Sequence, residues 1–198
     1  MGQAVVEDGG RVDEGMLDVD RALLGRVAGG DRAALADLYA RHQRPLFSYL
    51  LGLCRDRGVA EEVLQDTLLA VWTSAGSFGG RASVQGWLYG VARRQAHNTL
   101  RRRALPVANA AVLDLLPSPE PEPEDAALAG VARDELAAAI DRLAAIHREV
   151  LVLTFAEGLS YPELARVLDV PLGTIKSRLS NAKRALRAIL DHPEATTR

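Results

Sequence analysis

The stretch from Gly158 to Leu186, GLSYPELARVLDVPLGTIKSRLSNAKRAL, decides the fold of the C-terminal part of the chain. Ser160 and Glu163 have the spacing of a capping box, which marks the start of a helix. Pro171 disfavours an α conformation at the residue before it, so this first helix ends just ahead of the proline. A second helix starts directly after Pro171. Two helices joined by so short a turn predict a helix-turn-helix.

The second helix of this stretch has an apolar stripe at helical spacing and a polar opposite side. The stripe consists of Ile175, Leu179, Ala182 and Leu186, and the polar side of Lys176, Ser177, Ser180, Asn181 and Arg184. The second helix of a DNA-binding helix-turn-helix enters the major groove. A helical hairpin with a solvated basic face has the same pattern, so the motif alone leaves both interpretations open.

Composition bounds the class of protein. The 198-residue chain is 48% hydrophobic and only 5% aromatic, and the dominance of Ala and Leu predicts an all-α fold. No segment reaches the roughly 18 continuous apolar residues of a membrane span, and the first residues lack the basic and apolar parts of a signal peptide. Cys54 is the only cysteine, which excludes a disulfide framework and a cysteine cluster for zinc. We expect a cytoplasmic protein.

The net charge of −2 conceals a strong pattern along the chain. The charge is −5 over residues 1–20, +7 over 21–104, −5 over 105–127 and +1 over 128–198. For a nucleic-acid-binding protein the distribution of charge matters more than the total. The pattern therefore leaves room for a polyanionic partner.

Breaks in the pattern predict two small helical domains. The first spans 20–104, with helices expected at 21–28, 32–55, 59–73 and 84–103. Asp31 is the expected N-cap of the second helix, and Pro45 within it marks a kink or a boundary. The second domain spans 128–190, with helices expected at 126–143 and 148–157 ahead of the helix-turn-helix.

Three segments lie outside the two domains. Residues 1–19 are acidic and aperiodic, so we expect a disordered acidic tail. Residues 105–127 contain four prolines between Pro117 and Pro123, alternating with Ser and Glu, and are expected to be an extended acidic flexible linker. Residues 191–198 form a second tail.

The stretches that could suggest a catalytic motif lack the residues that such a motif requires. The Gly-rich stretch Gly25–Gly30 is followed by Asp31 instead of the Lys and Ser or Thr of a phosphate loop. No paired-ligand spacing links the four histidines, His42, His97, His147 and His192. Cys54 follows an apolar helical run, which favours a packed thiol over a nucleophile. We therefore predict a protein that is not an enzyme and has no catalytic residues, metal or cofactor.

Four stretches together resemble the extracytoplasmic-function (ECF) sigma factors of bacterial RNA polymerase. They are DRAALADLYARHQRPLFSYLLGLCRD with VAEEVLQDTLLAVW, SFGGRASVQGWLYGVARRQAHNTLRRR, HREVLVLTFAEGLSYPELARVLDV and PLGTIKSRLSNAKRALRAIL. The match covers about residues 20–190. It implies a sigma region 2-like domain, a region 4-like domain, and promoter-specific initiation through the −10 and −35 elements as a subunit of core RNA polymerase.

The resemblance also implies which residues make each contact in the first domain. The VAEEVLQDT helix corresponds to the segment that docks on the β′ clamp helices, with Glu61, Glu62, Gln65 and Asp66 as contacts. The SFGGRASVQ loop and the helix after it correspond to the −10 and melting segment, with Phe78, Arg81, Trp87, Arg93, Arg94, Arg101, Arg102 and Arg103. Core packing explains Trp87 equally well. The family often has an acidic residue at Arg81, an Arg at Gly90 and an Asn at Arg94, which leaves the −10 preference open.

In the second domain the resemblance assigns Lys176, Ser177, Ser180 and Asn181 to −35 base edges and Thr174, Arg178, Lys183 and Arg184 to phosphates. Asn181 stands where an Arg is frequent in the family. Because Arg suits guanine and Asn suits adenine, the sequence predicts a shifted preference at that base pair, which Asn181→Arg would test.

The expected partners are core RNA polymerase, through the β′ clamp helices and the β flap, promoter DNA and an anti-sigma factor, with no small-molecule substrate. By the resemblance the acidic linker threads toward the RNA-exit path of polymerase; a plain spacer is the alternative.

Two other functions are alternatives to a sigma factor. A stand-alone operator-binding regulator with a helix-turn-helix usually dimerises, but the chain has no dimerisation heptads. A helical interaction protein would not explain the cluster of arginines.

Overall fold

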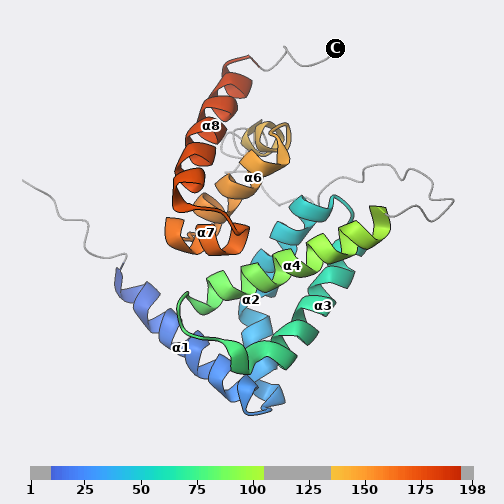
Figure 1. Cartoon of the computed structure of the whole chain (residues 1–198), viewed down its shortest axis with the longest axis vertical. Coiled ribbons are helices and arrows are strands. Elements are labelled where there is room, and N and C mark those ends of the chain that lie inside the picture. Colours follow the sequence, from blue (N-terminus) through green and yellow to red (C-terminus); the bar gives the residue numbers. More distant parts are fainter. Residues whose placement is uncertain (1–9, 105–134, 193–198) are drawn as a thin grey trace, which may run out of the picture. The chain divides into compact units, whose positions relative to one another are not determined.

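The computed structural model describes residues 10–104 and 135–192. The chain divides into two compact units, one up to Pro106 and one from Val107 onward. All the regular elements in the described ranges are helices, which confirms the all-α prediction (Figure 1). The predicted linker at 105–127, the first part of the helix expected at 126–143 and the end of the tail expected at 191–198 lie outside the described residues.

Helix α1 spans Gly10–Ala28. Its first ten residues, 10–19, fall in the stretch for which we predicted a disordered tail, so that prediction was wrong from Gly10 onward. The later turns of α1 bury Leu24 and Val27. Extending an existing helix adds one hydrogen bond for each residue fixed, whereas starting one is unfavourable. The packed turns therefore support the less periodic residues ahead of them.

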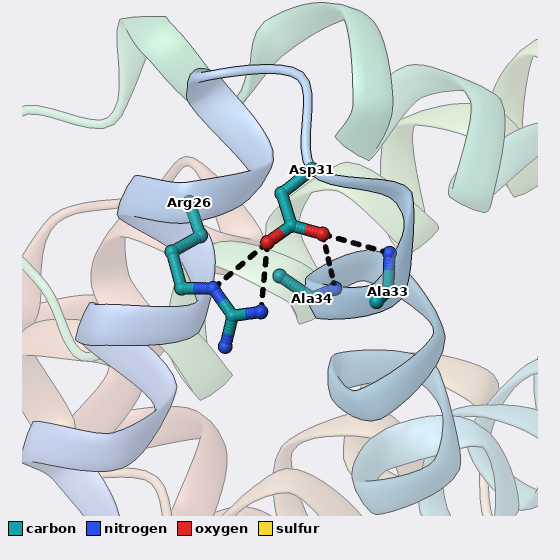
Figure 2. A network of polar contacts seen from close by, with 4 residues as sticks. All are labelled: Arg26, Asp31, Ala33 and Ala34. Carbon is teal, nitrogen blue, oxygen red and sulfur yellow. Dashed lines mark hydrogen bonds and ion pairs between the residues drawn. The ribbon is translucent and has the colours of Figure 1, made fainter.

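Helix α2 spans Arg32–Cys54, and Asp31 caps it as predicted. One carboxylate oxygen of Asp31 accepts from the backbone N–H groups of Ala33 at 2.9 Å and Ala34 at 3.1 Å, and the other accepts from Arg26 (Figure 2). The cap thus joins the end of α1 to the start of α2. Pro45 lies inside the continuous helix, so it does not form a boundary.

Two further helices complete the first unit. Helix α3 spans Arg57–Ser74 and is capped by Asp56, and a short 3-10 turn, η1, follows at Ala75–Ser77. Helix α4 spans Val84–Ala104. Helices α2, α3 and α4 pack against one another (Figure 1). Tyr49 of α2 and Tyr89 of α4 are both buried and meet edge to face, with ring centroids 5.2 Å apart.

Asp20 is a charged residue inside the first unit. It is only 4% exposed. Its carboxylate accepts from Arg41 Nε at 2.6 Å and lies 2.7 Å from His42 Nε2. A buried carboxylate is stable only when it is paired in this way, so Asp20 holds α1 against α2.

The second unit begins in the described part with helical residues 135–141. Helix α6, Ala145–Leu151, continues directly into a π-helical segment, η2, at Val152–Ala156. Our expectation of one ordinary helix over 148–157 was therefore wrong for its second half. A π segment adds a residue to the turn. Here it follows the buried Leu151 and brings Leu153 into the core, while Phe155 stays outside.

The helix-turn-helix follows as predicted. Helix α7 spans Tyr161–Leu168 behind the capping box of Ser160 and Glu163, whose carboxylate accepts from the Ser160 N–H at 3.0 Å. Asp169 adopts a left-handed conformation with φ 53°, which ends α7. Helix α8 then spans Leu172–Asp191. In the described ranges no helix has both the length and the apolar character needed to cross a bilayer.

Candidate nucleic-acid interface

Helix α8 presents the polar surface predicted from its sequence. Ile175, Leu179 and Ala182 are buried against the rest of the second unit. The four residues assigned to base edges are exposed on other sides of the helix: Lys176, Ser177, Ser180 and Asn181. Their exposure agrees with a groove-facing surface because none of them is needed for the core.

The four residues assigned to phosphates differ in their surroundings. Thr174 and Arg178 are half-buried, whereas Lys183 and Arg184 are exposed. Arg184 Nη2 donates to Asn181 Oδ1 at 2.7 Å. A residue assigned to phosphate and one assigned to bases therefore form a pair, which the resemblance did not indicate.

Lys183 has a partner on another element. Its Nζ lies 5.1 Å from the centroid of the Phe155 ring, within the range of a cation–π contact. Phe155 lies in η2 and is 63% exposed. Sequence reasoning missed Phe155 because an ordinary helix was expected there, and only the π segment and its packing bring the ring to α8.

The predicted −10 loop and the start of α4 each contribute one ring to an aromatic pair. Phe78 and Trp87 meet edge to face with centroids 5.7 Å apart at 67°. Both are half-buried, so each has a packed side and an accessible side, and Arg81 between them in sequence is exposed. The packing interpretation of Trp87 and its predicted role at a base are therefore compatible.

The arginines of α4 and the carboxylates of α3 meet. Arg103 Nη2 lies 2.6 Å from Glu62 Oε2, and Arg102 Nη2 lies 3.8 Å from Asp66 Oδ2. Arg102 also donates to the Thr99 hydroxyl at 3.0 Å. The residues assigned to polymerase and those assigned to DNA thus share ion pairs at one surface. Of the other arginines, Arg94 and Arg101 are exposed and Arg93 is half-buried.

The ion pairs described between α3 and α4 do not include Glu61 or Gln65. Glu61 Oε1 instead accepts from Arg57 Nε at 2.9 Å, one turn away on α3. Gln65 is exposed. Glu61 is therefore paired within α3, whereas Glu62 and Asp66 face α4.

An open groove of about 570 Å³ lies between α3 and α4. Asp66, Leu69 and Thr73 line it from α3, and Gln95, Asn98 and Arg101 line it from α4. Leu69 is 65% exposed, which is unusual for a large apolar side chain. No sequence signal marked Leu69, because it continues the apolar pattern of the helix.

Two further observations concern the metal-binding side chains and the single cysteine. Within residues 10–104 and 135–192 no group of three or more metal-binding side chains gathers. Cys54 is buried, and burial raises the pKa of its thiol. A buried thiol of this kind is a poor nucleophile, as the sequence predicted.

Comparisons with known proteins agree on one family. Residues 38–105 match Sigma-70 region 2, and residues 133–186 match Sigma-70, region 4. The chain is 34% identical over 184 residues to the ECF RNA polymerase sigma factor SigK of Mycobacterium tuberculosis, a match that covers 88% of this chain and 94% of that protein.

Solved structures give the same result. CnrH, solved in complex with the cytosolic domain of CnrY, is similar with a TM-score of 0.63 and 27% identity, over 87% of this chain and 97% of CnrH. The sigma factor RpoE of Bartonella quintana, solved with the anti-sigma factor NepR, shares the fold. Its TM-score is 0.59 and its identity 24%, over 82% of this chain and 99% of RpoE.

Proposed function

The chain belongs to the ECF RNA polymerase sigma factors and directs promoter recognition by RNA polymerase, and on this premise we propose which of its surfaces makes each contact. It is not an enzyme. Polymerase supplies the phosphoryl-transfer chemistry, and this chain supplies recognition and melting of the promoter.

Helix α8 reads the −35 element. The observation that carries this assignment is the exposed polar surface of Lys176, Ser177, Ser180 and Asn181 on the second helix of a helix-turn-helix, beside the buried Ile175 and Leu179. Such a helix enters the major groove, where base edges are distinguishable. Thr174, Arg178 and Lys183 flank that surface and contact phosphates.

The first unit holds the −10 element and helps to melt it. Phe78 and Trp87 form an aromatic pair with accessible sides, and bases taken out of a duplex stack on such surfaces. The exposed arginines along α4 neutralise the phosphates of the same strand: Arg94, Arg101, Arg102 and Arg103. Arg81 in the loop and the half-buried Arg93 add to this charge.

The acidic face of α3 docks on the clamp helices of polymerase. Glu61, Glu62 and Gln65 are exposed on this helix, and Asp66 is partly exposed. The exposed Leu69 lies one turn further along the same helix and adds an apolar contact. Carboxylates around an apolar centre provide steering and register against a basic partner.

Two more partners follow from the family. The second unit exposes the large apolar side chains Ile146, Phe155, Tyr161 and Leu172, which suit a contact with the β flap. CnrH was solved with the cytosolic domain of CnrY, and RpoE was solved with the anti-sigma factor NepR. By these similarities the chain also binds a regulatory protein of the anti-sigma kind.

A reconstituted transcription assay tests the function as a whole. The purified chain is added to bacterial core RNA polymerase on a pool of genomic promoter fragments. We expect new transcripts whose start sites share −35 and −10 sequences and which need the chain. Tight binding of duplex DNA by the chain alone, without new starts or a polymerase complex, would point instead to an operator-binding regulator.

A further inference from the structure

Arg184 lies on the side of α8 that faces away from the core. It follows Ser177 by seven residues and Ser180 by four, so the three share one side of the helix. Lys183, one position earlier, is turned toward the ring of Phe155 in η2. By position, Arg184 therefore belongs with the residues proposed to face the bases and not with a flank.

The side chain of Arg184 is held in place by Asn181. Its Nη2 donates to Asn181 Oδ1 at 2.7 Å. Side chains of a helix lean toward its N-terminus, so Arg184 reaches back by one turn to make this bond. Because a guanidinium has only donors, its partner must be the amide oxygen, and this assignment orients the amide of Asn181.

This bond changes what each side chain offers to DNA. An Asn reads adenine with its oxygen and its NH₂ group together, but here one of the two lone pairs of that oxygen already accepts from Arg184. The guanidinium has five donors in a planar fork, and the fork matches the O6 and N7 acceptors of guanine. The pair is therefore better suited to guanine than to adenine.

We propose that Arg184 is a specificity-determining residue that reads guanine in the −35 element and that Asn181 is its positioning residue. The proposal rests on the assignment of α8 to that element. The family often has an Arg where this chain has Asn181, and Arg184 brings a guanidinium to the same place from one turn further along. The adenine preference expected from Asn181 alone is then replaced by a guanine preference.

The test compares promoter preferences of holoenzymes. Core polymerase is reconstituted with the full chain carrying Arg184→Ala, Arg184→Lys, Asn181→Ala or Asn181→Asp, and bound to promoters randomised across the −35 element. Arg187→Ala is the matched control, since Arg187 is an exposed arginine one turn further along α8. The helical content of each variant, measured by circular dichroism, shows that it is folded.

We expect Arg184→Ala to lower the preference for guanine at one base pair by about tenfold, because the contact with O6 and N7 is lost. Arg184→Lys should lower the same preference, because an ammonium group lacks the rigid planar fork that Asn181 orients. Asn181→Ala should weaken the preference at the same base pair. Asn181→Asp keeps an acceptor for Arg184 and should retain the preference while lowering affinity for all promoters evenly. Arg187→Ala should also act evenly.

Three results would overturn the inference. Arg184→Ala could weaken all promoters evenly, as expected of a phosphate contact, or Asn181→Ala could abolish an adenine preference at a different base pair. In either case the wild-type holoenzyme still has a −35 preference, so only the proposed role of Arg184 is refuted. A wild-type holoenzyme with no −35 preference would refute the reading role of α8 and this inference with it.

Discussion

Arg103 of α4 and Glu62 of α3 form an ion pair across 41 residues of sequence, with 2.6 Å between Arg103 Nη2 and Glu62 Oε2. Both side chains are about half exposed, at 53% and 46%. Under the proposed function Glu62 contacts polymerase and Arg103 contacts DNA. The pair therefore joins the two activities at one surface, and polymerase that engages Glu62 leaves Arg103 available for DNA.

Glu62→Gln should raise the affinity of the free chain for single-stranded DNA. The substitution releases Arg103 from its carboxylate, and an exposed ion pair of this kind limits the gain to about fivefold. Binding of fluorescent oligo(dT), followed by anisotropy at low salt, measures the effect.

Glu61→Gln is the control for that measurement. It removes the same charge from the neighbouring position, but Glu61 pairs with Arg57 on its own helix. Equal affinities of the two variants for oligo(dT) would show that the change reflects net charge and not the release of Arg103. Both variants should bind core polymerase more weakly if α3 docks as proposed.

Asp20→Asn should destabilise the first unit by about 2 kcal/mol or more. Asp20 is buried and paired with Arg41 and His42, and removing one partner of a buried pair leaves the others unsatisfied. Urea unfolding followed by tryptophan fluorescence reports on this unit alone, because both tryptophans, Trp72 and Trp87, lie in it.

Asp37→Asn provides the comparison for Asp20. Asp37 is an exposed carboxylate of α2, and exposed substitutions of this kind change stability by about 0.5 kcal/mol or less. Similar unfolding midpoints for the two variants would mean that the buried pairing contributes nothing.

Asp31 should make stability depend on pH in the acid range. The N–H of Ala34, with the Arg26 guanidinium, holds the pKa of Asp31 below its ordinary value of 3.8. The unfolded chain therefore takes up the proton first. The stability that Asp31 contributes is present above pH 3.8 and is lost as the pH falls through the folded-state pKa.

The substitution Asp31→Asn keeps the helix cap but removes the charge. The free energies of unfolding of the wild type and Asp31→Asn should therefore differ by a constant amount above pH 3.8 and converge below it. Urea titrations across this range measure the difference. A difference that is independent of pH would contradict the assigned role of the charge.

Cys54 should react slowly with iodoacetamide in the folded protein. It is buried, and burial raises the pKa of the thiol, so both access and the thiolate fraction are reduced. As the only cysteine of the chain, it gives an unambiguous signal in mass spectrometry. The reaction in urea at the same pH should be more than about tenfold faster, because unfolding removes the burial; equal rates would mean that the thiol is accessible.

Some of the fold follows from local spacing alone. The helix-turn-helix could be predicted because the capping box of Ser160 and Glu163 and the stop at Pro171 act within single turns. The exposed side of α8 could be predicted for the same reason. The α1 start could not, because the residues after Gly10 have weak local signals and are helical by extension from packed turns.

In the candidate site, too, some features follow from local sequence and others depend on packing. The sequence determined the family, the all-α class and which helix faces carry charge, since these depend on residue type and helical period. Only the tertiary structure decided that Glu62 meets Arg103, that Asp20 is buried against Arg41 and His42, and that Phe155 meets Lys183. These pairs join different helices, and which residues face each other across helices is set by how their buried faces pack. Even Asn181 and Arg184, three residues apart on one helix, were near each other by spacing, but the bond between them depends on side-chain conformations that spacing does not specify.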